Sequence, residues 1–477
     1  MKASRARDLG SLAAEAPVES GRLRFEAAAR PRSHADCVLV WMQKAQRSRD
    51  NPALDMGFHL ANALGLPLLV LFVLTDYPGA QPGHYRFMRE GLAECAADLR
   101  DRGAAFLMDS GNPVDLVAAH GRRAAVLVAD EGKLAFERRW REEIAAMSDM
   151  PPLILVETES VVPPFAASDH QEWSAATLRR KISAKMPFYM ELPEGIPECR
   201  VAAKTSDFPG LSPSFPDSFG KEASGLNPLF SLQRLDFKPG WKAGMESFGH
   251  FLDSGGLERY PEARNDPCAR GQSGMSPHLH FGQISPVALA KAALERSPGA
   301  AQTYIEQLVV RRELALNYVL FNPGYDRYET AAPEWARKSL AAREDRKAIY
   351  TRSELESGLT GDAWWNAAQK EMLLTGKMHN YMRMYWGKQI LSWFPDPAIA
   401  FRLLVELNDT WSLDGRDPGG YAGIAWCFGR HDRPWPLRPL FGNVRSMAAS
   451  GLRKKFDVER YAAEVEDLYN VRRKEKP

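Results

Sequence analysis

The stretch MHNYMRMYWGKQILSWF, residues 378–394, concentrates aromatic and sulfur-containing side chains around a single arginine, Arg383. Read as a helix, it places Trp386 and Trp393 about 20° apart around the axis and roughly 10.5 Å apart along it. A protein core can bury such a helix without further purpose. Two indoles at this spacing, with Arg383 and Lys388 embedded nearby, also suit electron transfer or the binding of a flat aromatic ligand.

A second candidate, SGMSPHLHFGQISP at residues 273–286, combines small hydroxyl residues and glycine with the start of a helix. Backbone N–H groups at a helix start can hold phosphate oxygens, so this segment is a candidate phosphate-binding loop. His278 and His280 form an HxH pair without a third ligand, a pattern more typical of structural histidines than of a metal site. The sequence therefore predicts no bound metal.

The segment LNDTWSLDGRDPGGYAGIAW, residues 407–426, is rich in Asp and Gly. Its acidic side chains suit helix capping, and Asp414 can also pair with Arg383 and fix a ring edge that bears N–H and C=O groups. Residues 426–456, which follow, alternate Arg, Trp and Pro. Such a stretch suits a phosphate backbone with exposed bases, although a solvated basic loop has the same composition.

The composition of the 477-residue chain is ordinary for a globular protein, with 45% hydrophobic and 26% charged residues. Its formal net charge of +2 means that any basic face for nucleic acid must be local. The five cysteines contain no CxxC pair, which argues against a disulfide framework and a zinc site. The longest apolar run, residues 66–74, is too short to span a membrane, and we expect a cytoplasmic protein.

Elements of two kinds must position these candidate residues. Short apolar runs alternate with helical patterns in the first third of the chain, which predicts a doubly wound, parallel α/β sheet with strands at 37–42, 67–74, 104–109, 124–130 and 152–157. No GxGxxG or GxxxxGK[ST] motif is present, but a small molecule can still bind at the carboxyl ends of such strands. From about residue 241 the pattern is helical, and eight of the twelve tryptophans lie from Trp335 onward.

These patterns predict four segments along the chain. The first, residues 1–34, lacks an apolar signal core and reads as a loosely attached, flexible arm. An α/β domain follows at 35–165, and a Pro- and Ser-rich interdomain linker at 166–225. An all-α domain then occupies 226–477.

Three motifs in order, SGxSPxLHFGQIS, GKMHNYMRMYWGKQIL and LDGRDPGGYAG…W…HDR…RPLFG…RKKFDV, resemble those of the class II cyclobutane pyrimidine dimer photolyases of the photolyase/cryptochrome family. The resemblance runs from VLVWM near residue 38 to FDVERY near residue 461. It implies an α/β antenna-type domain, a linker and an all-α domain that binds FAD. It also implies light-driven repair, in which excited reduced FAD passes an electron to a pyrimidine dimer flipped out of double-stranded DNA.

The same resemblance implies a set of cofactor-binding residues. Arg383 and Asp414 resemble the ion pair beside the isoalloxazine, and Asn408 resembles an asparagine near flavin N5. Trp365, Trp386 and Trp393 resemble a chain that carries electrons from the surface to the flavin, with Trp386 nearest the flavin. The full implied FAD set is Tyr260, Gln272, Ser273, Gly274, Met275, Ser276, Arg383, Asn408, Asp414, Gly415 and Arg416. A second, antenna chromophore of unspecified identity is compatible with the α/β half.

The implied DNA-binding residues are Arg264, Glu306, Gln307, Arg311, Met384, Trp426, Arg433, Trp435 and Arg445. Met384 and Trp426 resemble groups that touch the flipped dimer. Where an acidic contact to the dimer is expected, the chain has Glu306 followed by Gln307, and register leaves open which one faces the site. The protein is expected to act as a monomer on damaged duplex DNA, away from membranes. The alternatives are a photolyase for the (6-4) photoproduct, a cryptochrome-type light sensor, and a flavoprotein oxidoreductase, which the absence of a nicotinamide fingerprint disfavours.

Overall fold

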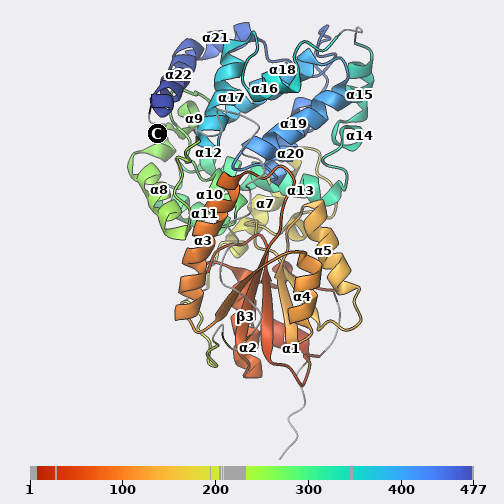
Figure 1. Ribbon diagram of the computed structural model, residues 1–477, viewed down its shortest axis with the longest axis vertical. Helices are drawn as coiled ribbons and strands as arrows, with labels where there is room; N and C mark the ends of the chain where they lie inside the picture. Colours follow the sequence, from red (N-terminus) through yellow and green to blue (C-terminus); the bar gives the residue numbers. More distant parts are fainter. Residues whose placement is uncertain are drawn as a thin grey trace, which may run out of the picture.

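The computed structural model describes residues 8–26, 30–193, 195–203, 206, 208, 233–343 and 347–474. Figure 1 shows an α/β half below a larger helical half along the long axis of the molecule. Helix α3 (Pro82–Asp101) reaches from the α/β half to the helical half. At their contact, His84 Nε2 lies 3.0 Å from the backbone oxygen of Ser412.

The α/β half is built on one six-stranded sheet with the order β1-β6-β5-β2-β3-β4. Strands β2 to β6 pair in parallel, which confirms the predicted doubly wound sheet, and β1 pairs antiparallel with β6. The strands are β1 (Leu23–Phe25), β2 (Cys37–Met42), β3 (Leu68–Leu74), β4 (Ala105–Ser110), β5 (Ala124–Asp130) and β6 (Leu153–Val156).

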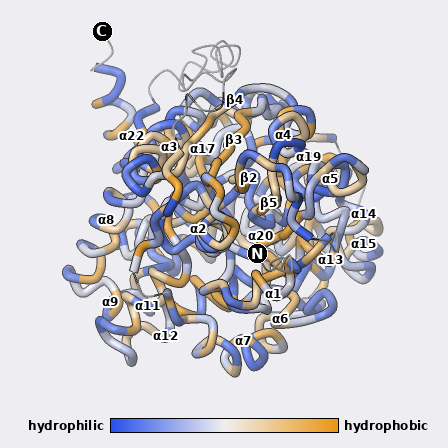
Figure 2. Tube along the Cα trace, turned by 90° about the horizontal axis from the view of Figure 1, so that it is seen from below, coloured by the Kyte–Doolittle hydropathy of each residue, from blue (hydrophilic) through white to orange (hydrophobic). Residues whose placement is uncertain are grey.

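Both faces of the sheet are covered, because alternate residues of each strand point to opposite sides. In β2, Val38 and Val40 face the core shared with α1, α2 and α3, whereas Leu39 and Trp41 face the core shared with α4 and α5. In Figure 2 the trace of strands β2 and β3 lies inside the molecule and has the colours of hydrophobic residues. The covering helices besides α3 are α1 (Leu9–Ala14), α2 (Pro52–Leu64), α4 (Pro113–Gly121) and α5 (Ala135–Ala145).

The prediction of a flexible N-terminal arm at 1–34 is wrong for the part of it that the structure describes. Helix α1 is capped by the Asp8 side chain and buries Leu9 and Leu12 in the core, because these two apolar residues lie on one face of the helix. After a 3-10 turn (η1, Ser20–Arg22), β1 completes the sheet edge. The Arg22 guanidinium donates to backbone oxygens of residues 160 and 161. Residues 1–7 and 27–29 lie outside the described part.

The predicted linker at 166–225 is wrong in its first part. Helices α6 (Pro164–Ala167) and α7 (Ala175–Tyr189) belong to the helical half, because Leu178 and Ile182 of α7 share a core with Phe248 and Tyr304. The apolar side chains of these helices are buried in this core, whereas the side chains of a linker would stay exposed to solvent. The predicted boundary at 225/226 lies outside the described residues.

The helical half contains most of the predicted helices. Its described elements, besides α6 and α7, are α8 (Trp241–Asp253), α9 (Gly256–Ala263), α10 (Ser276–His280), α11 (Pro286–Arg296), α12 (Gln302–Ile305), the π-helix η5 (Glu306–Arg311), α13 (Arg312–Phe321), α14 (Tyr328–Ala331), α15 (Glu334–Ala341), α16 (Arg352–Glu356), α17 (Ala363–Thr375), α18 (Asn380–Trp393), α19 (Pro397–Trp411), α20 (Pro418–Cys427), α21 (Ala449–Lys455) and α22 (Val458–Lys474). Within the described residues, no helix is long and apolar enough to cross a membrane.

Candidate functional site

The helical half encloses a cavity of about 410 Å³, which is in the size range of small-molecule sites. It is formed by α9, α10, α12, η5, α13, α18 and α20 together with the loops before α10, α18 and α20. We call it the helical cavity. Of the residues that the resemblance implied, it brings together Tyr260, Arg264, Gln272, Ser273, Gly274, Met275, Ser276, Gln307, Arg311, Arg383, Met384, Asp414 and Trp426.

An ion pair forms the polar wall of the helical cavity. Arg383 Nη2 donates to Asp414 Oδ1 at 2.8 Å, and the Ser412 hydroxyl donates to the same carboxylate oxygen at 2.6 Å. Burial alone would raise the pKa of Asp414, but Arg383, Lys377 and hydrogen bonds outweigh burial and hold that pKa well below its usual range. The carboxylate therefore stays ionised and the guanidinium stays in place, so the wall offers both hydrogen-bond donors and acceptors to a ring edge.

Asn408 supports this wall from behind. Its Oδ1 accepts from Arg383 Nη1 at 3.3 Å, and its Nδ2 donates to Asp409 at 3.1 Å. The Asn408 side chain is buried and does not line the cavity itself. The amide therefore orients the guanidinium of Arg383 in this structure.

Hydroxyl groups and a lysine lie beside this ion pair, since Ser276 and Lys377 both lower the pKa of Asp414. Ser273 and Ser276 flank Gly274, whose φ of 74° is a conformation that glycine adopts without strain. Lys377 Nζ donates to the Ser276 hydroxyl at 2.5 Å, and burial lowers the pKa of this lysine. Lys377 is not among the residues that the motifs implied. Its signal was a basic residue directly before the Met- and aromatic-rich helix α18.

Gly415 and Arg416 do not line the helical cavity, so the structure does not support their implied role as cofactor contacts there. A Cβ at Gly415 would lie 2.5 Å from the backbone oxygen of Asn408, so glycine is needed here for close packing. Arg416 has a φ of 56° and its guanidinium points away, toward Asp409 and the ring of Tyr77. Arg416 instead lines a second cavity, described below.

The π-helix η5 decides between Glu306 and Gln307. The Glu306 carboxylate accepts from Arg179 at 2.8 and 2.9 Å and from Arg311 at 3.0 Å, and these bonds, those of Arg179 first, lower its pKa. Gln307, one residue later, lines the helical cavity, and Arg311 lines it as well. Wide helical turns of this kind occur often at functional sites, because they re-aim side chains. The cavity therefore contains an amide at this position and no carboxylate.

Three tryptophans lie behind the cavity as a continuous series. The rings of Trp386 and Trp365 are stacked, with centroids 6.1 Å apart and planes 8° apart. The ring of Trp393 meets Trp365 edge-on, with centroids 5.2 Å apart. The order is therefore Trp386, Trp365, Trp393, and Trp386 follows the cavity-lining residues Arg383 and Met384 by three and two positions along α18. Trp393 is the most exposed of the three, at 8%.

A ladder of alternating rings and guanidinium groups leads from the cavity to the surface. The Arg445 guanidinium lies 5.8 Å from the ring of Trp426 and 4.9 Å from that of Trp435. Arg433 lies 5.7 Å from the ring of Trp435. Trp426 lines the helical cavity, whereas Arg433 and Arg445 are exposed. The basic, aromatic loop after α20 thus begins at the cavity wall.

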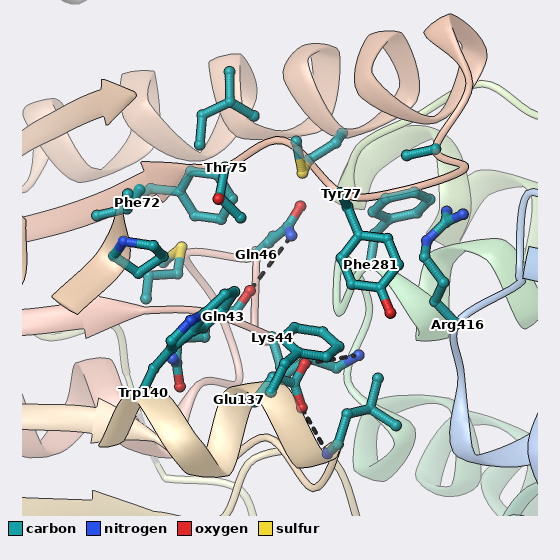
Figure 3. Close-up of a pocket in the computed structure, with 18 of the residues that line it drawn as sticks. Gln43, Lys44, Gln46, Phe72, Thr75, Tyr77, Glu137, Trp140, Phe281 and Arg416 are labelled. Atoms are coloured by element: carbon teal, nitrogen blue, oxygen red, sulfur yellow. Dashed lines mark hydrogen bonds and ion pairs between the residues drawn. The ribbon is translucent and has the colours of Figure 1, made fainter. Parts of the chain in front are cut away.

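The second cavity lies between the sheet and the helical half, and we call it the interdomain cavity (Figure 3). Its volume is about 150 Å³, and it is lined by the carboxyl ends of β2 and β3, by α3 and α5, and by the 280–281 end of α10. Figure 3 shows Tyr77 beside Arg416 and Trp140 on the opposite side. The Asp130 carboxylate accepts from the backbone N–H groups of residues 43, 44 and 45 and so fixes the exit of β2.

This cavity sits where strand order reverses between β2 and β5, the usual ligand-binding position of open α/β sheets. Its lining is rich in aromatic rings, with centroids of Tyr77 and Phe136 5.1 Å apart and those of Phe136 and Trp140 5.0 Å apart. No cluster of three or more His, Cys, Asp or Glu side chains able to hold a metal occurs in the described part of the chain.

Known proteins resemble this chain along most of its length. The profile of the DNA photolyase family matches residues 38–198. The chain is 39% identical to the deoxyribodipyrimidine photo-lyase of Methanothermobacter thermautotrophicus, over 94% of this chain and 99% of that protein. It is 38% identical to the deoxyribodipyrimidine photo-lyase of Oryza sativa subsp. japonica, over 90% of this chain and 88% of that protein.

Solved structures share the fold at much lower sequence identity. A cryptochrome from Synechocystis sp. PCC6803 superposes with a TM-score of 0.70 at 16% identity, covering 92% of this chain and 89% of that one. A class III photolyase from Agrobacterium tumefaciens superposes with a TM-score of 0.64 at 18% identity, covering 92% and 98%. These two similarities establish the fold alone. The sequence identity to the two photo-lyases, sustained over nine-tenths of the chain, establishes the family: this chain belongs to the DNA photolyase family.

Proposed function

We propose that this protein is a class II photolyase, which uses light to split cyclobutane pyrimidine dimers in DNA by electron transfer from reduced FAD. The observation that carries the proposal is that most residues assigned to the flavin line the same cavity as Gln307, Met384 and Trp426, which are assigned to the lesion. Cofactor and lesion would then lie in contact, and the electron would need no intermediate carrier between them.

The donors and acceptors of the helical cavity fit FAD. Ser273, Ser276 and Lys377 offer the hydroxyl and ammonium groups that a diphosphate needs, and Arg383 with Asp414 offers the paired donor and acceptor that a flavin ring edge needs. FAD, when bound, supplies the light absorption and the electron. The chain's own residues position that ring, keep one carboxylate ionised beside it, and exclude water from one side.

The lesion side of the cavity is formed by Gln307, Met384 and Trp426. The Gln307 amide can donate to and accept from the carbonyl and imide groups of a dimer, and it does so without titrating. Met384 and Trp426 supply apolar and stacking contact to a base taken out of the helix. Extrusion costs a few kcal/mol, less for a damaged pair, and contacts of Arg433, Trp435 and Arg445 with the duplex would offset it.

The tryptophan series has a separate role in this proposal. Trp386, Trp365 and Trp393 would pass electrons inward from the surface, which restores the reduced cofactor after oxidation. The series takes no part in splitting the dimer, because the lesion is in direct reach of the cofactor cavity. Repair and cofactor reduction are therefore separable by mutation.

The test is repair of DNA that carries one defined photoproduct. The purified, reduced protein should restore cyclobutane-dimer DNA under blue light, leave it unrepaired in the dark, and leave (6-4) photoproduct DNA unrepaired. Repair of the (6-4) DNA alone would transfer the assignment to the second lesion. A protein that holds flavin and photoreduces it, yet repairs neither substrate, would be a light sensor of the cryptochrome kind.

The interdomain cavity gives a second, independent proposal: a flat aromatic antenna chromophore that binds among Tyr77, Phe136, Trp140 and Phe281. At about 150 Å³ the cavity is smaller than typical ligand sites, so a chromophore larger than one ring system requires lining side chains to move. A bound antenna would add an absorption band and a matching peak in the action spectrum of repair. Protein that shows only flavin bands after expression in the native host would contradict this proposal.

A further inference from the structure

Trp426 differs from the three tryptophans of the series in what lies over its ring. Lys388 Nζ lies 5.0 Å from the Trp426 ring centroid, and the Arg445 guanidinium lies 5.8 Å from it. Among the described residues, no lysine or arginine lies over the rings of Trp365, Trp386 or Trp393. Two cationic side chains therefore lie over Trp426, the tryptophan that lines the helical cavity, and none of the described ones lies over the three tryptophans of the series.

Lys388 is an unusual cation because it is completely buried. It lies on α18, two residues after Trp386, with no exposed surface. Its ammonium group donates to the backbone oxygen of Cys427, the last residue of α20, at 2.6 Å. Within the described part of the chain, no carboxylate forms an ion pair with it. A buried charge of this kind is costly. Asp432 acts on this charge only from beyond ion-pair distance, so the positive field of Lys388 still reaches the neighbouring indole.

We propose that Lys388 is a positioning residue that prevents Trp426 from giving up an electron, so that electrons reach the cofactor only through Trp393, Trp365 and Trp386. The inference rests on the function proposed above. Trp426 lines the cavity in which the cofactor is proposed to bind. Without the charge on Lys388, its indole would compete with Trp386 as the electron donor to the cofactor. Loss of an electron from Trp426 would strand a radical beside the lesion, where no neighbour in the series can refill it.

The physical basis is repulsion between two positive charges. Removing one electron from an indole leaves a cation radical, and a unit charge 5.0 Å away opposes its formation. At an effective dielectric of about 20, this repulsion changes the equilibrium for electron loss by about a hundredfold or more. The exposed Arg445 adds less, because solvent and salt screen it.

The charge on Lys388 also depends on pH. Burial lowers its pKa to about 8, and Cys427, Asp432 and Arg445 are the charged or titratable groups that act on it. Cys427 stays neutral through this range, because burial raises its pKa to about 11. The ammonium form, and with it the protection of Trp426, is present below pH 8 and is lost as the pH rises through 8.

The experiment oxidises the protein in the dark, without lesion or light. An azide radical made by pulse radiolysis takes one electron from an indole and becomes azide, and the indole cation radical then releases its N–H proton. A second azide radical takes another electron, and water adds to the ring with release of a proton, which gives hydroxytryptophan. Peptide mass spectrometry measures oxidised Trp426 relative to oxidised Trp173, which is 60% exposed and serves as internal reference. The flavin-loaded wild type is compared with Lys388→Gln, which keeps an N–H donor but loses the charge, and with Lys388→Arg, which keeps the charge.

The Trp426 to Trp173 ratio should rise at least tenfold in Lys388→Gln and stay within twofold of wild type in Lys388→Arg. Wild-type protein at pH 9.5 should show the same rise over pH 6.5, a measurement that requires no mutant to fold. An unchanged ratio in both arms would overturn the proposal, because a purely structural lysine would alter stability and not the site of oxidation. Failure of lesion repair would leave this readout untouched, so the two proposals fail separately.

Discussion

The helical and interdomain cavities differ in what their walls are made of. The helical cavity is built around paired charges, of which Arg383 with Asp414 is the best defined. The interdomain cavity is smaller and has mainly apolar walls rich in aromatic rings, although the buried pair Lys44 and Glu137 also lines it. Paired charges fix the orientation of a polar ring, whereas aromatic walls accept a flat molecule with little directional preference. This difference fits the roles proposed above, electron-transfer chemistry for the first cavity and light collection for the second.

The largest effect is expected from breaking the charge pair. Arg383→Met leaves the buried Asp414 carboxylate without its main partner, which typically costs about 3–5 kcal/mol. We expect a fall of that size in the free energy of unfolding, measured with denaturant, together with loss of flavin absorbance after purification. Arg416→Met is the matched control, since it makes the same change at the interdomain cavity and should retain flavin. Equal flavin loss in both variants would remove the distinction between the cavities.

The next effect concerns the tryptophan series behind the helical cavity. Trp386→Phe keeps an aromatic ring of similar size but removes the more easily oxidised indole. We expect photoreduction of the oxidised protein, followed by time-resolved absorbance, to slow by about a hundredfold, a barrier increase of about 2.7 kcal/mol. Chemically reduced protein should still repair at nearly the wild-type rate. Trp140→Phe, the same exchange in the interdomain cavity, should photoreduce normally, and normal photoreduction in Trp386→Phe would return helix α18 to simple core packing.

A smaller effect is expected at the ladder outside the helical cavity. Trp435→Ala removes one stacking ring and should weaken binding to dimer-containing duplex by about 1–3 kcal/mol. Arg445→Ala should reduce the slope of log affinity against log salt by about one unit. Fluorescence anisotropy at several salt concentrations measures both quantities. Arg122→Ala, an exposed arginine of the α/β half, is the control, and a control that matched Arg445→Ala would show that the ladder does not face the duplex.

The smallest effect separates the two cavities by pH. Burial raises the pKa of Glu159, beside Lys44 at the edge of the interdomain cavity, to about 7. Its raised pKa means that folding binds a proton, so the stability from this group is complete below pH 4.5 and declines as pH rises toward 7. Glu159→Gln should flatten this decline by about 2 kcal/mol between pH 5 and 7.5 in denaturant titrations.

Asp414 provides the contrast within the same titration. Its pKa is lowered, so its contribution is present above the unfolded value of 3.8 and is lost only as the pH falls below that value. The helical cavity should therefore contribute no slope between pH 5 and 7.5. A slope that persists unchanged in Glu159→Gln would assign the decline to other buried groups.

The fold of the α/β half followed from local pattern. Five apolar runs became five parallel strands within one or two residues of their predicted bounds, because buried parallel strands must be apolar on both faces. The same reasoning failed where burial depends on a distant partner. Helix α7 reads as part of a linker because the residues that bury it, such as Phe248 and Tyr304, come more than fifty residues later.

Much of the helical cavity was also determined by the sequence, since motif order carried the implied roles of Arg383, Asp414 and Trp426 to one site. The direction in which individual side chains point was not determined by the sequence. Arg416 lies two residues from Asp414, yet a positive φ turns it to the other cavity. A one-residue widening in η5 points Gln307 inward and leaves Glu306 with Arg179.

The sequence by itself determined which residues this protein has for its chemistry and which elements hold them, because strand and helix periodicity and residue order are local properties. The tertiary structure alone decided the order of the series, with Trp365 between Trp386 and Trp393, although Trp365 comes from a different helix. It alone placed Lys388 of α18 over the ring of Trp426 of α20. Both are distances between residues on separate helices, and helix packing sets such distances through contacts that periodicity does not encode.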